Sequence, residues 1–333
     1  MKTVKSVIIS LVVFLVTPVC VQGEAYTAGI FPHISFAAYV IADAKGLYEK
    51  EGVEVNTVQY EVGADWIRAV KNNKVDFATV WASTHLDMCL NGMNAVNLGF
   101  ICFNRGGHNK LVVKKGMTPE KLRGKPVGIL SDYFGIHYLI YDYLNTHNVR
   151  FSEVRIVEMD EEAAYENFIR GRLQAIVPAV AHLSMVVKNG NGVVIPWSED
   201  IVNACMGGFV HFRKETATPE SDLKKVIRAL VKALRWYNNP SNDKELQAIL
   251  TRSFRLNLTL AGMADDEHYK ATRKKQQFFN DKELLYHNGD FVRNVYEKMM
   301  RARKDIGYPG DVAYNYEDMV KTHIMLEVIN EMK

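Results

Sequence analysis

The sequence has few cysteines, and none of them has metal-ligand spacing. Cys20, Cys89, Cys102 and Cys205 are the four in 333 residues, too scattered for a zinc motif or a disulfide framework. The immediate neighbours of Cys89 and Cys102 are apolar, which is typical of buried free thiols. We therefore expect no bound metal, no cofactor and no small domain held together by disulfides.

A charge excess is also missing. The chain has 41 basic and 38 acidic side chains. Such a balance gives no long-range field that would attract nucleic acid or an anionic membrane surface. Proline-rich linkers, low-complexity stretches and internal repeats are absent as well. Nor does the sequence contain a nucleophile elbow, a His-Glu-x-x-His helix motif or a phosphate-binding loop.

Long apolar runs are confined to the N-terminus. Lys2 and Lys5 precede an apolar run, Val7–Val16, and the small residues of Val21–Gly23 follow. This order predicts a secretory signal peptide over residues 1–23, with a mature chain that starts at Glu24 in the periplasm. The run is too short to span a bilayer, which takes about 20 apolar residues.

Cys20 raises the alternative of a lipoprotein. A lipidated cysteine normally follows a leucine and then small residues, whereas Thr17-Pro18-Val19 precedes Cys20 here. Anchoring through Cys20 is therefore not expected.

The mature chain alternates short apolar strands with helical patterns, which is typical of an α/β fold. Beyond Pro219 the pattern becomes almost wholly helical, with Leu223, Val226, Ile227, Leu230 and Leu234 on one face. At 48% hydrophobic residues the chain can bury one large core or two medium ones. The expected strands are Ala25–Phe31, Val53–Tyr60, Val75–Val80, Ala95–Phe103, Pro126–Leu130, Val154–Met159, Leu173–Val177 and Phe209–Arg213.

Several short phrases occur in an informative order. They are Ala42-Asp43-Ala44-Lys45-Gly46-Leu47-Tyr48-Glu49-Lys50-Glu51-Gly52-Val53-Glu54-Val55, then Lys74-Val75-Asp76-Phe77-Ala78, Leu122-Arg123-Gly124-Lys125-Pro126-Val127-Gly128 and Gly171-Arg172-Leu173-Gln174-Ala175. Together they resemble the periplasmic binding proteins for sulfonates, taurine, nitrate and thiamine pyrimidine precursors. The resemblance covers roughly residues 25 to 215, and the charged helical tail matches only in character.

The resemblance implies a type II periplasmic-binding-protein fold, in which two α/β lobes hold a ligand in the cleft between them. It places two crossovers near Asn109–Val113 and Gly207–Phe212. The lobes would comprise 24–112, then 113–207, with 208–333 returning to the first lobe as the helical C-terminal part. It also implies a monomer that delivers a small molecule to the permease subunits of an ABC importer.

Ligands of open α/β sheets bind beyond the C-terminal ends of the strands, where helix N-termini present free N–H groups. Four such junctions stand out, and they suggest a flat or partly apolar solute. Aromatic rings could stack on it, and hydroxyls could bind its polar group. The candidate residues at these junctions are Phe31 and His33, Trp81, Ser83 and Thr84, Asp132, Tyr133 and Phe134, and Pro178.

Each candidate also has a structural interpretation. Trp81 and Phe31 could equally be core residues, His33 a loop residue, and Asp132 a helix cap. Asp132 stands where the related proteins usually have a Gly-Ser-Thr turn for anions, which favours a neutral or cationic heterocycle. Arg105 follows a buried strand and could pair with an anionic ligand or with an acid of the opposite lobe.

Two other functions remain open. A fungal pyrimidine synthase with this fold resembles the same phrases, but it uses a Cys-rich, iron-associated stretch that this sequence does not contain. A receptor that signals to a partner protein instead of feeding a transporter would have the same sequence features.

Overall fold

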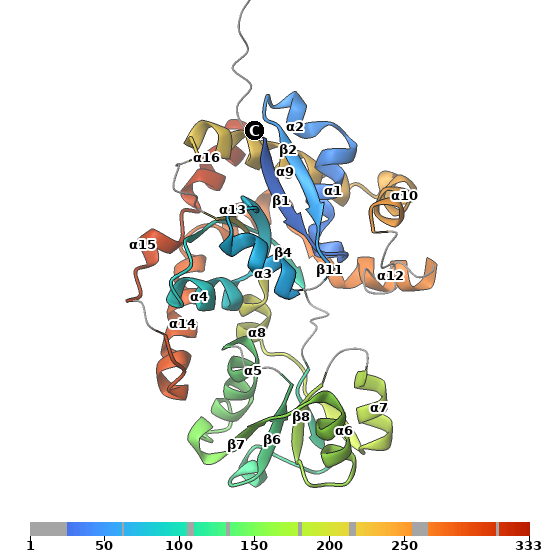
Figure 1. Ribbon diagram of the computed structural model, residues 1–333, viewed down its shortest axis with the longest axis vertical. Coiled ribbons are helices and arrows are strands. Elements are labelled where there is room, and N and C mark those ends of the chain that lie inside the picture. The colour runs from blue at the N-terminus through green and yellow to red at the C-terminus, as the bar shows by residue number, and fades with distance from the viewer. Residues whose placement is uncertain are drawn as a thin grey trace, which may run out of the picture.

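The structure is a computed structural model that describes residues 25–61, 63–104, 110–130, 134–178, 182–212, 218–254, 266–310 and 313–333. It has two lobes of unequal size, each with its own β-sheet (Figure 1). The predicted signal peptide lies outside the described residues. No helix within these ranges is long and apolar enough to cross a membrane.

The larger lobe has a six-stranded sheet in the order β11-β4-β10-β3-β1-β2. Strands β1, β2 and β3 are parallel, whereas β10 runs antiparallel between β3 and β4. All seven residues of β10 are buried, as expected for a central strand covered on both faces. The strands are β1 (Tyr26–Ile30), β2 (Val55–Gln59), β3 (Phe77–Trp81), β4 (Ala95–Asn104), β10 (Met206–Phe212) and β11 (Gln276–Phe278).

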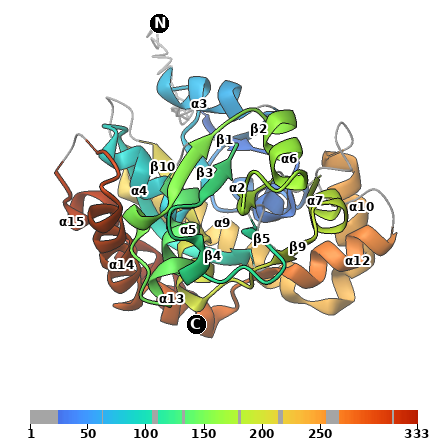
Figure 2. The ribbon, with the colours of Figure 1, turned by 90° about the horizontal axis from the view of Figure 1, so that it is seen from below.

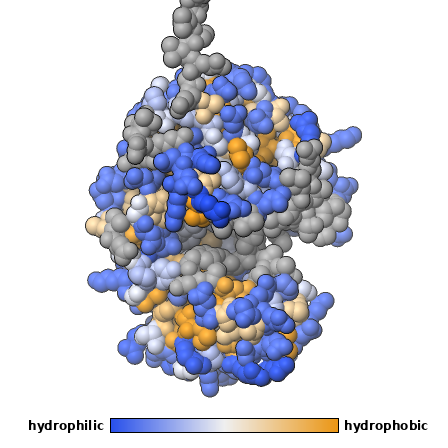
Figure 3. Space-filling model, in the orientation of Figure 1, coloured by the Kyte–Doolittle hydropathy of each residue, from blue (hydrophilic) through white to orange (hydrophobic). Residues whose placement is uncertain are grey.

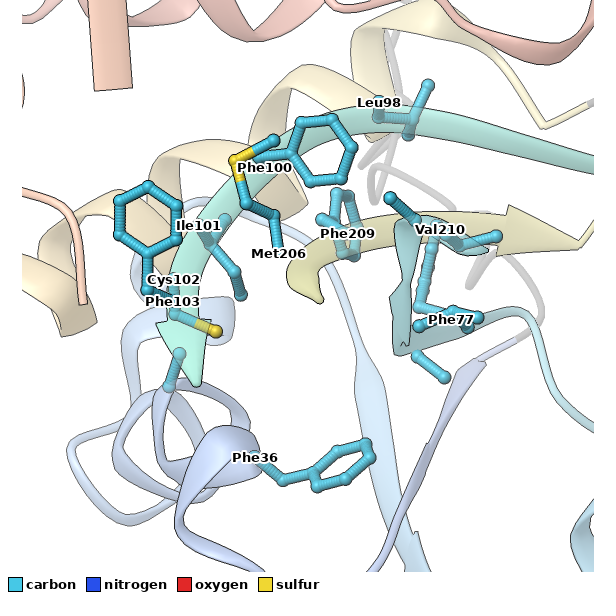
Figure 4. Close-up of a cluster of buried hydrophobic side chains, with 14 of the residues drawn as sticks. Phe36, Phe77, Leu98, Phe100, Ile101, Cys102, Phe103, Met206, Phe209 and Val210 are labelled. Atoms are coloured by element: carbon cyan, nitrogen blue, oxygen red, sulfur yellow. The ribbon is translucent and has the colours of Figure 1, made fainter. Parts of the chain in front are cut away.

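The core of this lobe is rich in aromatic side chains. Phe77 stacks on Phe209 of the neighbouring strand, with ring centroids 5.2 Å apart. Figure 4 shows the side chains of β3, β4 and β10 gathered in this core. The helices of the lobe are α1 (Ala37–Ala44), α2 (Leu47–Lys50), α3 (Gly63–Lys71), α4 (Ala82–Leu90), α9 (Glu220–Asn238), α10 (Asp243–Ser253), α12 (Asp266–Lys275), α13 (Asp281–His287), α14 (Phe291–Ile306), α15 (Tyr316–Met319) and α16 (His323–Glu331).

The apolar face expected beyond Pro219 forms the buried side of α9. All five of its apolar residues are buried, and the helix packs on α1, α2 and α16. The strand β11 was not expected, since the sequence around it has a helical, charged character. It pairs with β4 through three residues only.

The smaller lobe has a five-stranded sheet in the order β7-β6-β8-β5-β9. Its faces follow the period of two expected for strands. Val112 and Ile176 face α6 and α7 in a small separate core, whereas Val113 and Val177 join the main core. Figure 2 shows this lobe from below. Its elements are β5 (Val112–Lys114), β6 (Pro126–Ile129), β7 (Arg155–Glu158), β8 (Ala175–Val177), β9 (Gly192–Val194), α5 (Phe134–Asn145), α6 (Glu161–Ile169), α7 (Leu183–Asn189) and α8 (Glu199–Ala204).

The chain crosses between the sheets twice. The first crossing lies between β4 and β5, and the second between β9 and β10. The expected position of the second crossover, Gly207–Phe212, is wrong, because this segment is the central strand β10. Phe209–Phe212 of the expected strand belong to β10, which begins three residues earlier, at Met206. The lobe boundaries at residues 112 and 207 stay a prediction.

The lobes contact each other through α5, which packs on α4 and α14 of the larger lobe (Figure 1). Arg303 of α14 is the centre of this contact and is only 3% exposed. Its Nη1 donates to Oδ1 of Asp87 in α4 at 2.8 Å, and its Nη2 donates to the carbonyl of Pro309. The guanidinium also lies 5.1 Å from the ring centroid of Phe134 in α5. One side chain thus joins elements of both lobes.

We predict that Arg303→Met lowers the free energy of unfolding by about 3–5 kcal/mol, because it leaves the Asp87 carboxylate without its buried partner. Urea denaturation measures this loss. Arg293→Met on the same helix is the matched control, since Arg293 forms a surface ion pair with Glu317 and lies over the Tyr316 ring. Its cost should stay at about 1 kcal/mol or less. Equal costs for the two variants would contradict a special role of Arg303.

Candidate functional site

The candidate residues stand at strand ends that lie near the two places where the chain passes between the lobes. In the larger lobe, Trp81 at the end of β3 pairs with Gly207, one residue after the chain has returned at Met206. In the smaller lobe, Val112 at the start of β5 pairs with Ile176 near the end of β8. Because the chain crosses at these points, the C-terminal ends of β1, β3, β6 and β8 lie at the edges where the lobes meet.

A pocket of about 260 Å³ lies at this edge of the larger lobe. Figure 3 shows that the surface narrows to a waist between the lobes. Four aromatic rings, one histidine and three hydroxyls line the pocket, and no other charged or ionisable side chain does so among the described residues. Its lining residues are Phe31, His33, Ser35, Phe36, Trp66, Thr79, Val80, Trp81 and Thr84.

The aromatic side chains of this pocket hold one another in place. Phe31 lies edge-on to Phe36 and tilted to Trp66, with centroid distances of 5.8 Å in both cases. Trp66 in turn packs edge-to-face on Phe212 of β10 at 5.7 Å. Such pairs fix ring orientation beyond what apolar burial alone achieves. The pocket therefore presents flat apolar surfaces in a defined arrangement.

His33 is fixed by its own backbone turn. It caps the short 3-10 helix Ile34–Phe36, where its Nδ1 accepts from the backbone N–H of Ser35 at 3.2 Å. The hydroxyl of Ser35 lies 2.7 Å from the same nitrogen. His33, two residues before Ser35, therefore caps this turn.

Four of the expected site residues come together in this pocket: Phe31, His33, Trp81 and Thr84. Trp81 is partly exposed and packs against the core with one part of its ring. That these four residues contact a ligand stays a prediction. The sequence did not identify Ser35, Phe36, Trp66 and Thr79 as site residues. The apolar pattern assigned them to helices or strands, but it does not show which ends of these helices and strands face the cleft.

Other expected residues lie elsewhere. Ser83 is buried inside the first turn of α4, and Trp81, not Ser83, occupies the N-cap position. Phe134 is 0% exposed and packs against Tyr138, Tyr308 and Arg303 in the contact between the lobes, so here it is a core residue. Pro178 is buried directly after β8. Arg105, Asp132 and Tyr133 lie outside the described residues.

The three described cysteines form no disulfide with one another. Cys89 and Cys102 are buried and Cys205 is partly exposed. Burial raises the pKa of the Cys102 thiol to about 12, with the Gln276 side chain and the Gly207 backbone acting in the opposite direction. The thiol is therefore neutral at physiological pH. Within the described ranges no group of three or more His, Cys, Asp or Glu side chains could hold a metal ion.

Solved structures that are similar to this one include ligand-binding proteins. The ligand-binding component of an ABC-type import system from Staphylococcus aureus, solved with zinc bound, has a TM-score of 0.61 and 13% identity, covering 91% of this chain and 98% of its own. The aliphatic sulphonate-binding protein SsuA of Escherichia coli has a TM-score of 0.58 and 14% identity, covering 91% and 99%. The nitrate-binding protein NrtA of Synechocystis PCC 6803 has a TM-score of 0.58 and 13% identity, covering 93% and 90%.

At these identities the likeness shows the fold, which is the two-lobed α/β fold of periplasmic binding proteins. Residues 33–242, more than half of the chain, match the family model described as NMT1/THI5 like. The chain belongs to this NMT1/THI5-like family. No curated protein matches it.

Gly207 makes room for the Trp81 side of the pocket. A Cβ on Gly207 would lie 2.7 Å from Sγ of Cys102, 2.9 Å from Cγ2 of Thr79 and 3.1 Å from Cζ3 of Trp81. We predict that Gly207→Ala displaces these side chains and lowers the free energy of unfolding by about 1–3 kcal/mol, as overpacking does. Urea denaturation tests this.

Gly289→Ala is the control for this substitution, because the nearest atom to its added Cβ is 3.6 Å away. That variant should be as stable as the original protein or slightly more stable. A Gly207→Ala variant of unchanged stability would show that Trp81 and Cys102 do not pack on Gly207.

Proposed function

We propose that the protein is an exported periplasmic solute-binding protein that captures a small, flat, partly apolar organic molecule and delivers it to an ABC importer. The observation that carries the proposal is the aromatic pocket at the edge where the lobes meet, lined by Phe31, Trp66 and Trp81. Concave, mostly apolar pockets with a few polar groups are typical of small-molecule sites. The described lining suits a ring better than a bare sulfonate or nitrate ion, which needs cationic or N–H donors.

Two alternatives differ in what happens after binding. A synthase-like enzyme would convert its ligand, so mass spectrometry of a bound compound after long incubation should show it chemically unchanged if the binding role is correct. A sensory receptor would bind the same compound without transport. Genes for a permease and an ATPase beside this gene would favour transport.

Trp81 provides the sharpest test of the binding role. A thermal-shift screen with pyrimidines, flavins, aromatic acids and sulfonates should identify a compound that raises the melting temperature. We predict that Trp81→Ala binds this compound at least about tenfold more weakly by calorimetry, because it loses a stacking surface. Its melting temperature without ligand should fall only slightly, since the ring is partly exposed.

Trp236→Ala is the matched control. Trp236 also is partly buried, but it lies on α9 beneath Lys45, away from the pocket. It should bind the compound normally. Unchanged affinity in Trp81→Ala, together with a loss of about 3–5 kcal/mol in the free energy of unfolding, would show that Trp81 is a core residue. This result would contradict the proposed site. The partner role expected for Tyr133 on the opposite lobe stays a prediction.

Binding should bring the two lobes together. The two crossings allow a hinge motion, and the α5 contact on one side can act as its pivot. We predict that saturation with the compound found in the screen lowers the radius of gyration in small-angle X-ray scattering. An unchanged radius of gyration at full occupancy would show that the ligand enters a preformed pocket without closure.

A further inference from the structure

Several buried polar groups beside the pocket have no hydrogen-bond partner. Among them are the hydroxyls of Tyr39 and Thr79 and both amide atoms of Gln276. These side chains are 0%, 6% and 3% exposed, respectively. Buried polar groups without partners are rare in native proteins, because each one gives up its bonds to water and gains nothing in return. A cluster of them calls for a functional reason.

The strand register brings these groups to one face of the sheet. Thr79 and Trp81 are two residues apart on β3 and therefore lie on the same face of the sheet. Their partners on β10 are Phe209 and Gly207, respectively. The ring of Tyr39, from α1, packs on Phe209 at 6.3 Å. Its hydroxyl neighbours Thr79 and Cys102 without forming a hydrogen bond of normal geometry.

Gln276 reaches the same place from β11, where it pairs with Asn104 at the end of β4. Its side chain neighbours the thiol of Cys102. The side chains of Cys102, Thr79 and Trp81 fill the space that a side chain on Gly207 would occupy. Together with Gln276 they extend across β11, β4, β10 and β3. Figure 4 shows Cys102 on β4 beside β10.

Thr79 and Trp81 connect this cluster to the pocket, since both also line it. The Trp81 ring lines the pocket, and its Cζ3 atom lies 3.1 Å from the place that a Cβ on Gly207 would take. A rotation of the indole would therefore open the polar cluster to a molecule that already occupies the aromatic pocket.

All the groups in the cluster are uncharged at neutral pH. Threonine and glutamine side chains do not ionise in this range. Burial raises the pKa of the Tyr39 phenol far above its usual value and the pKa of the Cys102 thiol to about 12. Together they provide hydroxyl and amide donors and amide and hydroxyl acceptors. Such a set pairs with a neutral amide-like edge and leaves a carboxylate, sulfonate or ammonium without a counter-charge.

We propose that Tyr39, Thr79 and Gln276 determine the specificity of the site by selecting an aromatic or heteroaromatic ligand with an uncharged, amide-like hydrogen-bonding edge. This inference rests on the proposed binding function and specifies its ligand class. The ring lies in the aromatic pocket between Phe31 and Trp81, and the polar edge enters the cluster beside Gly207.

Benzamide, benzoate and benzylamine are the probes, because they carry a neutral, an anionic and a cationic group on one ring. Their dissociation constants are measured by ligand-observed NMR. Benzamide should bind at least about tenfold more tightly than either ion, since an ion would be desolvated without a partner. Tighter binding of benzoate or benzylamine would overturn the ligand class while leaving the binding function intact. Binding of no probe, while another compound binds in the broader screen, would also overturn the class; binding of nothing in either panel would overturn the function itself.

Thr79→Val, Tyr39→Phe and Gln276→Met remove the polar atoms and nearly preserve shape. Each should weaken benzamide binding about fivefold to tenfold, as expected for one lost hydrogen bond. Their melting temperatures without ligand should stay equal or rise, because an unpartnered polar group is removed. Lower melting temperatures, or unchanged affinity for benzamide, would mean that the groups serve the fold and not the ligand.

A control separates the site from general effects of burial. Thr57 on β2 also has a buried hydroxyl without a partner, and β2 is the edge strand, separated from β3 by β1. Thr57→Val should therefore bind benzamide like the original protein. Weaker binding in this variant would show that the effect is indirect.

Discussion

The hydrogen bonding of β10 between β3 and β4 is the constraint on which the rest of the structure depends. This strand follows the second crossing in the chain and lies between β3 and β4, in the middle of the larger sheet. Its first residues thus lie at the edge where the lobes meet. Because Gly207 stands there without a side chain, Trp81, Thr79 and Cys102 can converge on one point. Sheet completion and pocket shape are consequences of the same pairing.

The contact between the lobes shares helix α4 with the pocket, since Thr84 lines the pocket and Asp87 accepts from Arg303. Arg303 ties α4 and α14 to Phe134 at the start of α5, and the hydroxyl of Tyr141 on α5 donates to Asp305 at 2.8 Å. The proposed closure would turn about this buried contact, which is held by several bonds. The family and the fold together favour capture of a solute between the lobes.

The sequence indicated the architecture well, because apolar periodicity and turn residues are local signals. Strands in the parallel part of each sheet and the buried face of α9 were predictable for this reason. The predictions failed where position depends on distant partners. The strand β11 is too short for a pattern, Phe134 is buried by Arg303 from 169 residues away in the chain, and Gln276 reaches Cys102 only through strand pairing. Phe31, His33, Trp81 and Thr84 were found because they follow strands, a rule that local sequence can express.

The central claim is that one ligand is held between the lobes, with its ring on Trp81 and its neutral edge on Thr79 and Gln276. Crystals grown with a compound of confirmed affinity test this most directly. The account predicts electron density for the compound in the pocket of Phe31 and Trp81, hydrogen bonds to the Thr79 hydroxyl and the Gln276 amide, and contact with the smaller lobe. Density confined to another surface, or a ligand in this pocket with Thr79 and Gln276 still unpartnered, would contradict it.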